Sequence, residues 1–239
     1  MSGWRAVVFD LDDTLYPERD FVLGGFQAAA SWVETHLGVP ADGGYAELRR
    51  LYESGVRGDT FNRWLEALGI EAAPIVPRLV DAYRRHQPRL EPFPEVVGVL
   101  SRLRLRLQVG LLSDGFLDVQ RRKLEALNVA HLLDAVVFSD EWGREAWKPN
   151  PRPFLAILER LGVAAASTVY VADNPLKDFV GARQLGFGTV QVLRAGGEYA
   201  GVAAPTPEHA ADHVARDLAE CERLIAPTPG VNRLREEHA

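Results

Sequence analysis

The sequence is poor in cysteine and has no long hydrophobic run. Its 239 residues include one cysteine, Cys221. A lone cysteine excludes an intramolecular disulfide and a cysteine-based metal cluster. No stretch is apolar over the length that a membrane span or a signal h-region needs. We therefore expect a cytoplasmic protein that does not work at a membrane.

Positive charge is also in short supply, because 27 Lys and Arg residues face 33 Asp and Glu residues, a formal net charge of −6. Proteins that bind nucleic acid generally need a basic surface, so we expect no nucleic-acid partner. The chain is 47% hydrophobic and 25% charged. That composition is typical of globular proteins and excludes a disordered tail or a coiled coil. It is equally compatible with a monomer and a homodimer.

Short apolar runs recur along the chain and are separated by segments with helical periodicity. Such runs predict buried strands, because strands covered on both faces are continuously apolar. The expected strands are 5–9, 108–112, 135–138, 168–172 and 189–193. Their alternation with helices predicts an α/β fold, a Rossmann-like parallel sheet core with helices on both faces.

The long segment between the first two expected strands has helical periodicity and no comparable apolar run. Prolines mark both of its edges, where they disfavour a continuous helix. We therefore expect a small all-helical domain inserted into a discontinuous core, with a frayed polar tail after it. The expected ranges are 1–16 and 91–239 for the core, 17–90 for the helical domain and 228–239 for the tail.

Polar residues follow the expected strands directly. Because parallel sheets bind ligands beyond the carboxyl ends of their strands, these residues are the candidates for a site. They are Asp10, Asp12 and Thr14 after the first strand, Ser113 and Asp114 after the second, and Asp173 and Asp178 after the fourth, with Lys148 ahead of a helix. Converging carboxylates repel one another, and a hard divalent cation such as Mg²⁺ would relieve that repulsion.

The alternation in Asp10-Leu11-Asp12 places both carboxylates on one side of the chain. Two carboxylates facing one substrate suit a nucleophile and a separate acid/base, which a phosphoryl transfer through an acyl phosphate requires. Lys148, Ser113 and Thr14 would supply hydrogen-bond donors to the phosphoryl oxygens. Asp114 is expected to hydrogen-bond the turn around Gly115.

Four segments together resemble the signature motifs of the haloacid dehalogenase superfamily, specifically its phosphatases with a helical cap inserted after the first strand. The segments are FDLDDT at 9–14, LLSDG at 111–115, WKPNPRPF at 147–154 and VYVADNPLKD at 169–178. The resemblance implies that Asp10 is the nucleophile and Asp12 the general acid/base. It implies that Mg²⁺ is bound by the carboxylates of Asp10 and Asp173 and by the backbone carbonyl of Asp12.

The resemblance further implies that Ser113 and Lys148 hold the phosphoryl group and that Asp178 orients Lys148 or a metal-bound water. Thr14 would support the loop after the first strand. We expect a Mg²⁺-dependent phosphatase that hydrolyses a phosphomonoester of a small soluble metabolite through an aspartyl-phosphate on Asp10. Arg19, Asp20 and Trp147 are the candidates for substrate specificity.

Three other functions compete with hydrolysis of a phosphomonoester. A dehalogenase is disfavoured, because similar dehalogenases lack an acid at the position of Asp12. A phosphomutase of the same superfamily stays open, since it would use the same four motifs. A non-catalytic regulator that binds a phosphorylated ligand also stays open. Such a protein is expected to have lost some catalytic residues, whereas Asp10, Asp12, Lys148 and Asp173 are all present.

Overall fold

The computed structural model describes residues 3–225. The chain divides into two compact units, one of Met1–Glu18 with Glu91–Ala239 and one of Arg19–Leu90. Each unit is described by itself below. The tail expected at 228–239 lies outside the described residues.

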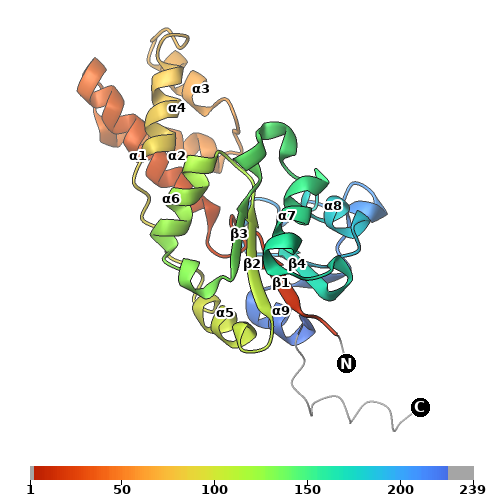
Figure 1. The fold of residues 1–239 in the computed structure, drawn as a ribbon. Helices are drawn as coiled ribbons and strands as arrows, with labels where there is room; N and C mark the ends of the chain where they lie inside the picture. Colours follow the sequence, from red (N-terminus) through yellow and green to blue (C-terminus); the bar gives the residue numbers. More distant parts are fainter. Residues whose placement is uncertain (1–2, 226–239) are drawn as a thin grey trace, which may run out of the picture. The chain divides into compact units, whose positions relative to one another are not determined.

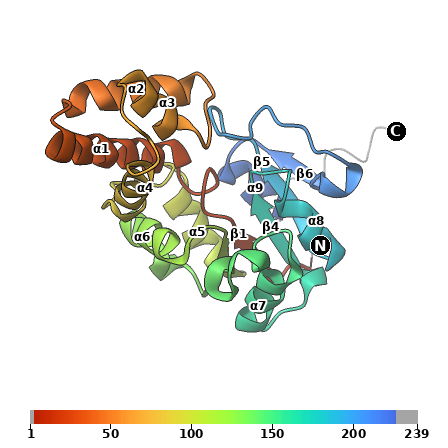
Figure 2. The ribbon, with the colours of Figure 1, turned by 90° about the horizontal axis from the view of Figure 1, so that it is seen from above.

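The first unit contains a parallel sheet in the order β3-β2-β1-β4-β5-β6, of which Figure 1 labels β1 to β4 and Figure 2 labels β5 and β6. Its strands within residues 3–225 are β1 (Ala6–Phe9), β2 (Gln108–Ser113), β3 (Ala135–Phe138), β4 (Thr168–Ala172), β5 (Gly188–Val192) and β6 (His213–Ala215). The five expected strands are present, with ends shifted by at most a residue. Strand β6 was not expected, because His213 and Val214 are exposed and form no apolar run.

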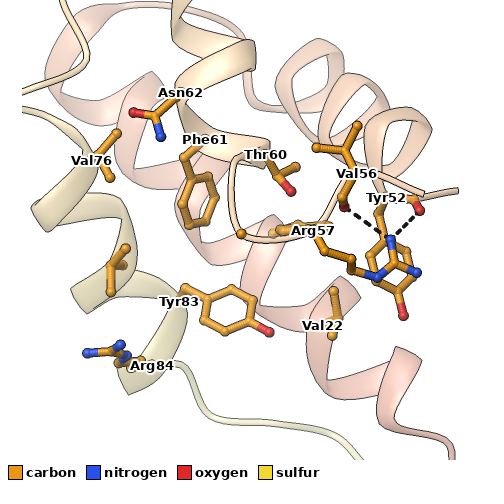
Figure 3. A pocket seen from close by; sticks show the side chains of 13 residues that line it. Val22, Tyr52, Val56, Arg57, Thr60, Phe61, Asn62, Val76, Tyr83 and Arg84 are labelled. Atoms are coloured by element: carbon orange, nitrogen blue, oxygen red, sulfur yellow. Dashed lines mark hydrogen bonds between the residues drawn. The ribbon is translucent and has the colours of Figure 1, made fainter. Parts of the chain in front are cut away.

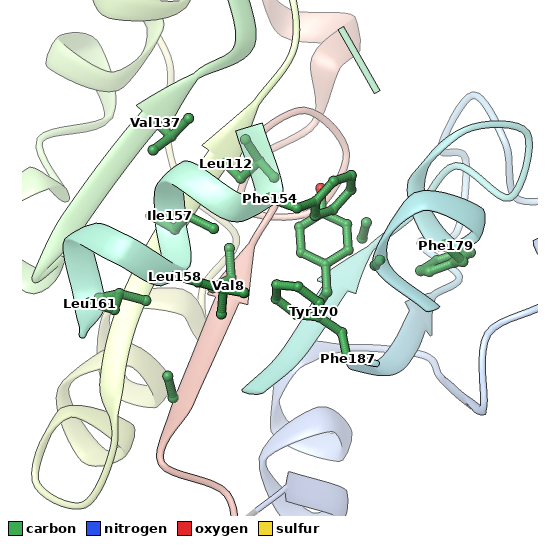
Figure 4. Packing of buried hydrophobic residues seen from close by; sticks show 13 residues of the cluster. Val8, Leu112, Val137, Phe154, Ile157, Leu158, Leu161, Tyr170, Phe179 and Phe187 are labelled. Atoms are coloured by element: carbon green, nitrogen blue, oxygen red, sulfur yellow. The ribbon is translucent and has the colours of Figure 1, made fainter. Parts of the chain in front are cut away.

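Helices cover both faces of this sheet, as the alternating pattern predicts. They are α5 (Val96–Arg104), α6 (Leu117–Leu127), α7 (Pro151–Leu161), α8 (Asp178–Gln184) and α9 (Leu218–Ile225). Helices α7 and α8 pack on the side of the sheet to which Val8 and Tyr170 point (Figure 4). There the ring of Phe154 meets that of Tyr170 edge-on, with centroids 5.2 Å apart.

Helix α7 begins and ends where its sequence predicts, and it fixes the segment before it. The Asn150 side chain accepts a hydrogen bond from the backbone N–H of Arg152 at 2.9 Å, which caps the first turn. Gly162 follows the last turn with φ of +63°, a left-handed conformation that glycine adopts without strain. Lys148 lies just ahead of this cap.

The order of the strands places a ligand-binding crevice beside β1. Strand β1 pairs with β2 on one side and with β4 on the other. The chain runs outward to β3 in one direction and to β6 in the other. In open parallel sheets, such a switch point binds ligands at the carboxyl ends of the strands. The residues after β1, β2 and β4 therefore meet at this edge.

Residues 19–90 are all described and are helical (Figure 2). The helices are α1 (Glu18–Leu37), which begins at the last residue of the first unit, α2 (Ala41–Glu53), α3 (Thr60–Ala67) and α4 (Val76–Arg85). They share a core that includes Phe26, Leu48 and Trp64. A Cβ atom on Gly44 would lie 2.4 Å from the Trp64 ring, so only glycine lets α2 approach α3 this closely. Among the described residues, no helix has the length and apolar character required to cross a bilayer.

Candidate active site

Asp10 follows β1 at the switch point and is almost wholly buried, with 5% of its surface exposed. Its backbone N–H donates to the carbonyl of Val171 on β4 at 2.9 Å, which fixes its place at the sheet edge. The Lys148 ammonium lies 2.9 Å from Asp10 Oδ1 and 2.7 Å from Asp178 Oδ1. It also donates to the Tyr170 hydroxyl at 2.8 Å. One buried cation therefore links β1, β4 and α8.

Burial and neighbouring charges govern the protonation of this cluster. Burial raises the pKa of Asp10 to about 6, although the nearby Lys148 charge lowers it. For Lys148, the attraction of Asp10 and Asp178 outweighs burial and raises its pKa well above the ordinary value. Lys148 is therefore charged at neutral pH and compensates part of the negative charge around Asp10.

Carboxylate oxygens of Asp10, Asp173 and Asp178 all lie within 4.8 Å of one another and are buried. Burial, followed by the charges of Asp178 and Asp10, raises the pKa of Asp173 well above the ordinary value. Such a set of hard oxygen donors, whose repulsion Lys148 compensates only in part, fits a divalent cation such as Mg²⁺. Asp178, which is expected to orient Lys148 or a metal-bound water, has its Oδ1 2.7 Å from the Lys148 ammonium and a carboxylate oxygen within this same 4.8 Å group.

Asp12 lies two residues after Asp10 and is held by donors from outside the motif. Its Oδ1 accepts hydrogen bonds from the Tyr16 hydroxyl at 2.5 Å and from Lys123 Nζ at 2.7 Å. Its Oδ2 accepts from Gln120 Nε2 at 2.9 Å. Burial alone would raise the pKa of Asp12, but the Lys123 charge and these hydrogen bonds lower it below the ordinary value.

The loop after β2 contributes Ser113 and Asp114. Ser113 is fully buried, and its Oγ accepts a hydrogen bond from Gln120 Nε2 at 2.6 Å. Asp114 accepts from the backbone N–H of Lys148 at 3.1 Å and from Lys177 Nζ at 2.9 Å. The expectation that Asp114 serves the turn around Gly115 is therefore wrong. Its carboxylate instead joins the loops that carry Lys148 and Lys177.

A cavity of about 150 Å³ opens among these residues. Its lining residues come from the loops after β1, β2, β4 and β5, from the first residue of α1 and from the segment before α7. They are Asp10, Asp12, Glu18, Asp114, Gly115, Trp147, Asp173, Asn174, Lys177 and Tyr199. The structure thus brings together the expected acids and Trp147. The Trp147 ring is held by a hydrogen bond from its Nε1 to Asp140 at 2.9 Å.

The three expected phosphate-binding residues, Thr14, Ser113 and Lys148, do not line this cavity, and two expected specificity residues, Arg19 and Asp20, belong to the helical unit. Thr14 and Ser113 are fully buried. Thr14 presents its backbone carbonyl to Arg194, at 2.8 Å. Arg19 pairs with Glu53 at 2.5 Å, while Asp20 is exposed.

A family model described as haloacid dehalogenase-like hydrolase matches residues 4–186, which include all of these site residues except Tyr199. The chain belongs to this family. It is 34% identical to a glyceraldehyde 3-phosphate phosphatase of Methanopyrus kandleri, over 80% of this chain and 84% of the relative. It is 30% identical to (S)-2-haloacid dehalogenase 1 of a Pseudomonas species, over 81% of this chain and 86% of the relative.

Solved structures show the same fold. The haloacid dehalogenase (HAD) phosphatase of Thermococcus onnurineus superposes with a TM-score of 0.61 at 24% identity. The match covers 93% of this chain and 98% of that one. The parallel sheet with helices on both faces is therefore the fold of HAD-like hydrolases.

The sequence motifs did not predict Lys123 and Lys177 as residues of this HAD-like site. The scarcity of lysine in the chain could have indicated both. The 27 basic residues of the chain include three lysines, Lys123, Lys148 and Lys177; the rest are arginines. Each of these lysines pairs with an acid of the site. Because nearly all other basic residues of the chain are arginines, a lysine indicates a position at which a compact ammonium fits better than a guanidinium.

Glu18, at the start of α1, was also missed and lines the cavity. Burial and the charge of Asp12 raise the pKa of Glu18 to about 8. Its carboxyl therefore holds a proton more readily than that of an ordinary glutamate.

The helical unit of this HAD-like hydrolase contains a second cavity, of about 310 Å³ (Figure 3). Its walls include the aromatic rings of Phe26, Tyr52, Phe61 and Tyr83. The Arg57 guanidinium stacks 3.9 Å from the centroid of Tyr52 and donates to the carbonyl of Tyr52 at 2.6 Å. Its lining residues include no carboxylate, so the cavity offers no pair of carboxyl groups for acid/base catalysis, while its aromatic and valine side chains could contact an apolar group.

Proposed function

We propose that this HAD-like hydrolase is a Mg²⁺-dependent phosphatase that hydrolyses a phosphomonoester of a small soluble metabolite. The observation that carries the proposal is the second carboxylate, Asp12, on the cavity wall beside the buried Asp10. An alkoxide leaving group needs a proton, whereas a halide leaves as a stable anion. The glyceraldehyde 3-phosphate phosphatase relative supports the same chemistry. We further propose that the enzyme is cytoplasmic, a monomer or homodimer, and has no nucleic-acid partner.

In the proposed mechanism, a carboxylate oxygen of Asp10 attacks phosphorus and forms an aspartyl-phosphate. The bond to the leaving oxygen breaks, and that oxygen takes a proton from Asp12, so this step proceeds from the protonated form of a group that is mostly ionised in the free protein. A water then attacks phosphorus and gives its proton to Asp12, and the electron pair of the broken P–O bond returns to Asp10. Lys148, 2.9 Å from Asp10, offsets negative charge through both steps.

Mg²⁺ fits the acidic group and would be held by the carboxylates of Asp10 and Asp173 and the backbone carbonyl of Asp12. Bound there, it would supply the positive charge that lets an anionic phosphoryl group approach Asp10. Asp178 would orient Lys148, since its Oδ1 lies 2.7 Å from that ammonium. The backbone N–H of Asn174 donates to Asp178 Oδ2 at 3.1 Å and fixes the carboxylate for this role.

We also propose that the helical residues 17–90 act as a cap that selects the substrate. Support comes from the aromatic cavity of this unit, which can accept an apolar group. Trp147 would contribute to selection on the core side, because it lines the cavity that contains Asp10. Arg19 and Asp20 stay candidates from the sequence. Ser113 and Thr14 would act on the phosphoryl group only after a rearrangement, since both are buried.

The test is phosphate release from p-nitrophenyl phosphate and a panel of phosphorylated metabolites, with and without Mg²⁺. We expect Asp10→Asn to lower kcat at least about a thousandfold, because it removes the nucleophile. Asp118→Asn, a change of an exposed aspartate on α6, is the matched control and should keep full activity. Equal background rates in wild type and Asp10→Asn would refute catalysis and favour a non-catalytic regulator. Turnover that depends on a bisphosphate primer would instead indicate a phosphomutase.

A further inference from the structure

The carboxylate of Asp12 is surrounded by hydrogen-bond donors. Oδ1 accepts from Lys123 at 2.7 Å and from Tyr16 at 2.5 Å, and Oδ2 accepts from Gln120 at 2.9 Å. An ammonium and an amide nitrogen are donors only. In this arrangement both oxygens of Asp12 therefore act as acceptors, and the plane of the carboxylate is fixed from two sides.

Lys123 provides the charge in this arrangement. It lies on α6, one turn after Gln120, so the two side chains share a face of the helix. The side chain of Lys123 is 4% exposed and that of Asp12 is 19% exposed. Burying such an ion pair costs desolvation energy and is a weak source of stability. A role in positioning Asp12 therefore explains the burial of Lys123 better than a role in stabilising the fold.

Composition supports the same conclusion. The chain uses arginine at nearly all of its basic positions, yet keeps lysine at position 123. A guanidinium is a wide planar fork, whereas an ammonium is compact and directs its three donors around a point. Lys148, the other fully enclosed lysine, contacts the nucleophile itself. Lys123 occupies the equivalent place beside the acid/base.

We infer that Lys123, assisted by Tyr16 and Gln120, is a positioning residue that holds Asp12 as the proton acceptor for hydrolysis of the aspartyl-phosphate. The inference rests on the proposed phosphatase function. In this half-reaction the water oxygen bonds to phosphorus while the bond from phosphorus to Asp10 breaks. The electron pair returns to the Asp10 carboxylate, and the water proton passes to the oriented Asp12 carboxylate.

This role gives a kinetic signature that a structural role does not. With p-nitrophenyl phosphate the leaving group needs no proton, so formation of the aspartyl-phosphate should be nearly unaffected in Lys123→Met. Its breakdown should slow by about ten- to a hundredfold, part of the gain that a general base provides. We therefore expect kcat and KM to fall together, kcat/KM to stay within about threefold, and a pre-steady-state burst of about one p-nitrophenol per active site.

Companion variants make the test specific. Tyr16→Phe removes one donor and keeps the buried ring, so it should show the same pattern with a smaller fall in kcat. Asp12→Asn should show the burst as well, and Lys123→Met in that background should add at most about a twofold effect, because both changes remove one function. Arg121→Met, an exposed cation two positions earlier on α6, should leave kcat and KM unchanged.

The outcomes separate the inference from the function beneath it. If wild type hydrolyses the substrate and Asp10→Asn does not, yet Lys123→Met loses kcat/KM and shows no burst, the residue is merely structural and the inference is overturned. Additive losses in the double variant overturn it too. If wild type and Asp10→Asn show the same background rate, the proposed phosphatase function is refuted, and the inference is refuted with it because it depends on that function.

Discussion

The ammonium of Lys148 lies 2.9 Å from Oδ1 of Asp10, and both side chains are almost wholly removed from solvent. The contact is buried and charge-assisted, so replacing only one of the two residues leaves the charge of the other buried without its partner. Asp178 shares the same ammonium at 2.7 Å. Removing the cation would leave two buried carboxylates without compensation.

Lys148→Met should therefore destabilise the protein strongly in Mg²⁺-free buffer. Breaking a buried pair from one side costs about 3–5 kcal/mol, because it leaves uncompensated buried charge. Urea denaturation measures the loss. Arg102→Met is the control, since its pair with Glu222 is exposed and its removal should change stability little. Similar midpoints for the two variants would contradict this account of Lys148.

Mg²⁺ should stabilise the protein more at neutral pH than at about pH 5. Burial raises the pKa of Asp10 from 3.8 to about 6 in the metal-free protein. Between those values the folded state binds more protons than the unfolded chain, so metal-free stability falls as pH rises. The cation compensates a charge that is fully developed only above this range. Thermal unfolding with and without Mg²⁺ at both pH values measures the difference.

Asp173→Asn is the control for the metal effect. It removes a carboxylate from the group whose oxygens lie within 4.8 Å of one another. Without Mg²⁺ the variant should unfold at the same or a higher temperature than wild type, because repulsion is relieved. Its response to Mg²⁺ should be largely lost. A full response in this variant, or equal wild-type shifts at both pH values, would place the cation elsewhere.

The sequence was sufficient to predict the acidic edge of the sheet. Asp10 and Asp173 directly follow continuous apolar runs, and parallel strands bring such residues together whatever the loop details. The positions of the strands follow from the same runs. Strand β6 could not be found in this way, because its three residues pair with β5 through their backbone and include two exposed side chains.

The donors around Asp12 could not be predicted from local patterns. Gln120 and Lys123 lie more than a hundred positions along the chain from Asp12. Their spacing on α6 is that of any polar pair on one helix face. Only the three-dimensional packing of α6 reveals their common target. Thr14 shows the converse, since its motif predicts a phosphate donor while the structure buries its side chain fully.

Gly181 should resist substitution by alanine because α8 passes very close to the segment after Lys148. A Cβ atom at this position would lie 2.4 Å from the carbonyl oxygen of Pro149. Gly181→Ala must push that backbone away, and we expect a loss of about 1–3 kcal/mol. We also expect a lower kcat, because Lys148 is attached to the displaced segment.

Gly43→Ala is the matched control for this prediction. Gly43 is exposed on α2, and an added Cβ would meet nothing within 4 Å. Alanine is favoured over glycine inside a helix, so this variant should gain about 0.5–1 kcal/mol. Urea denaturation and kcat on p-nitrophenyl phosphate compare the two. A gain in stability for both variants would show that the contact at Gly181 is easily relieved.

Val56→Phe should change which substrates the enzyme prefers if the helical unit selects them. Val56 lines the cavity of about 310 Å³ in that unit, and a phenyl ring would occupy part of this volume (Figure 3). We expect kcat/KM for the metabolites with the largest apolar groups to fall at least about fivefold relative to the smallest, since pocket volume discriminates on this scale. Val97→Phe, a change of a 46% exposed valine on α5, should leave the ranking unchanged. An unchanged ranking in Val56→Phe, with the fold intact by circular dichroism, would assign selection to the core residues around Trp147 instead.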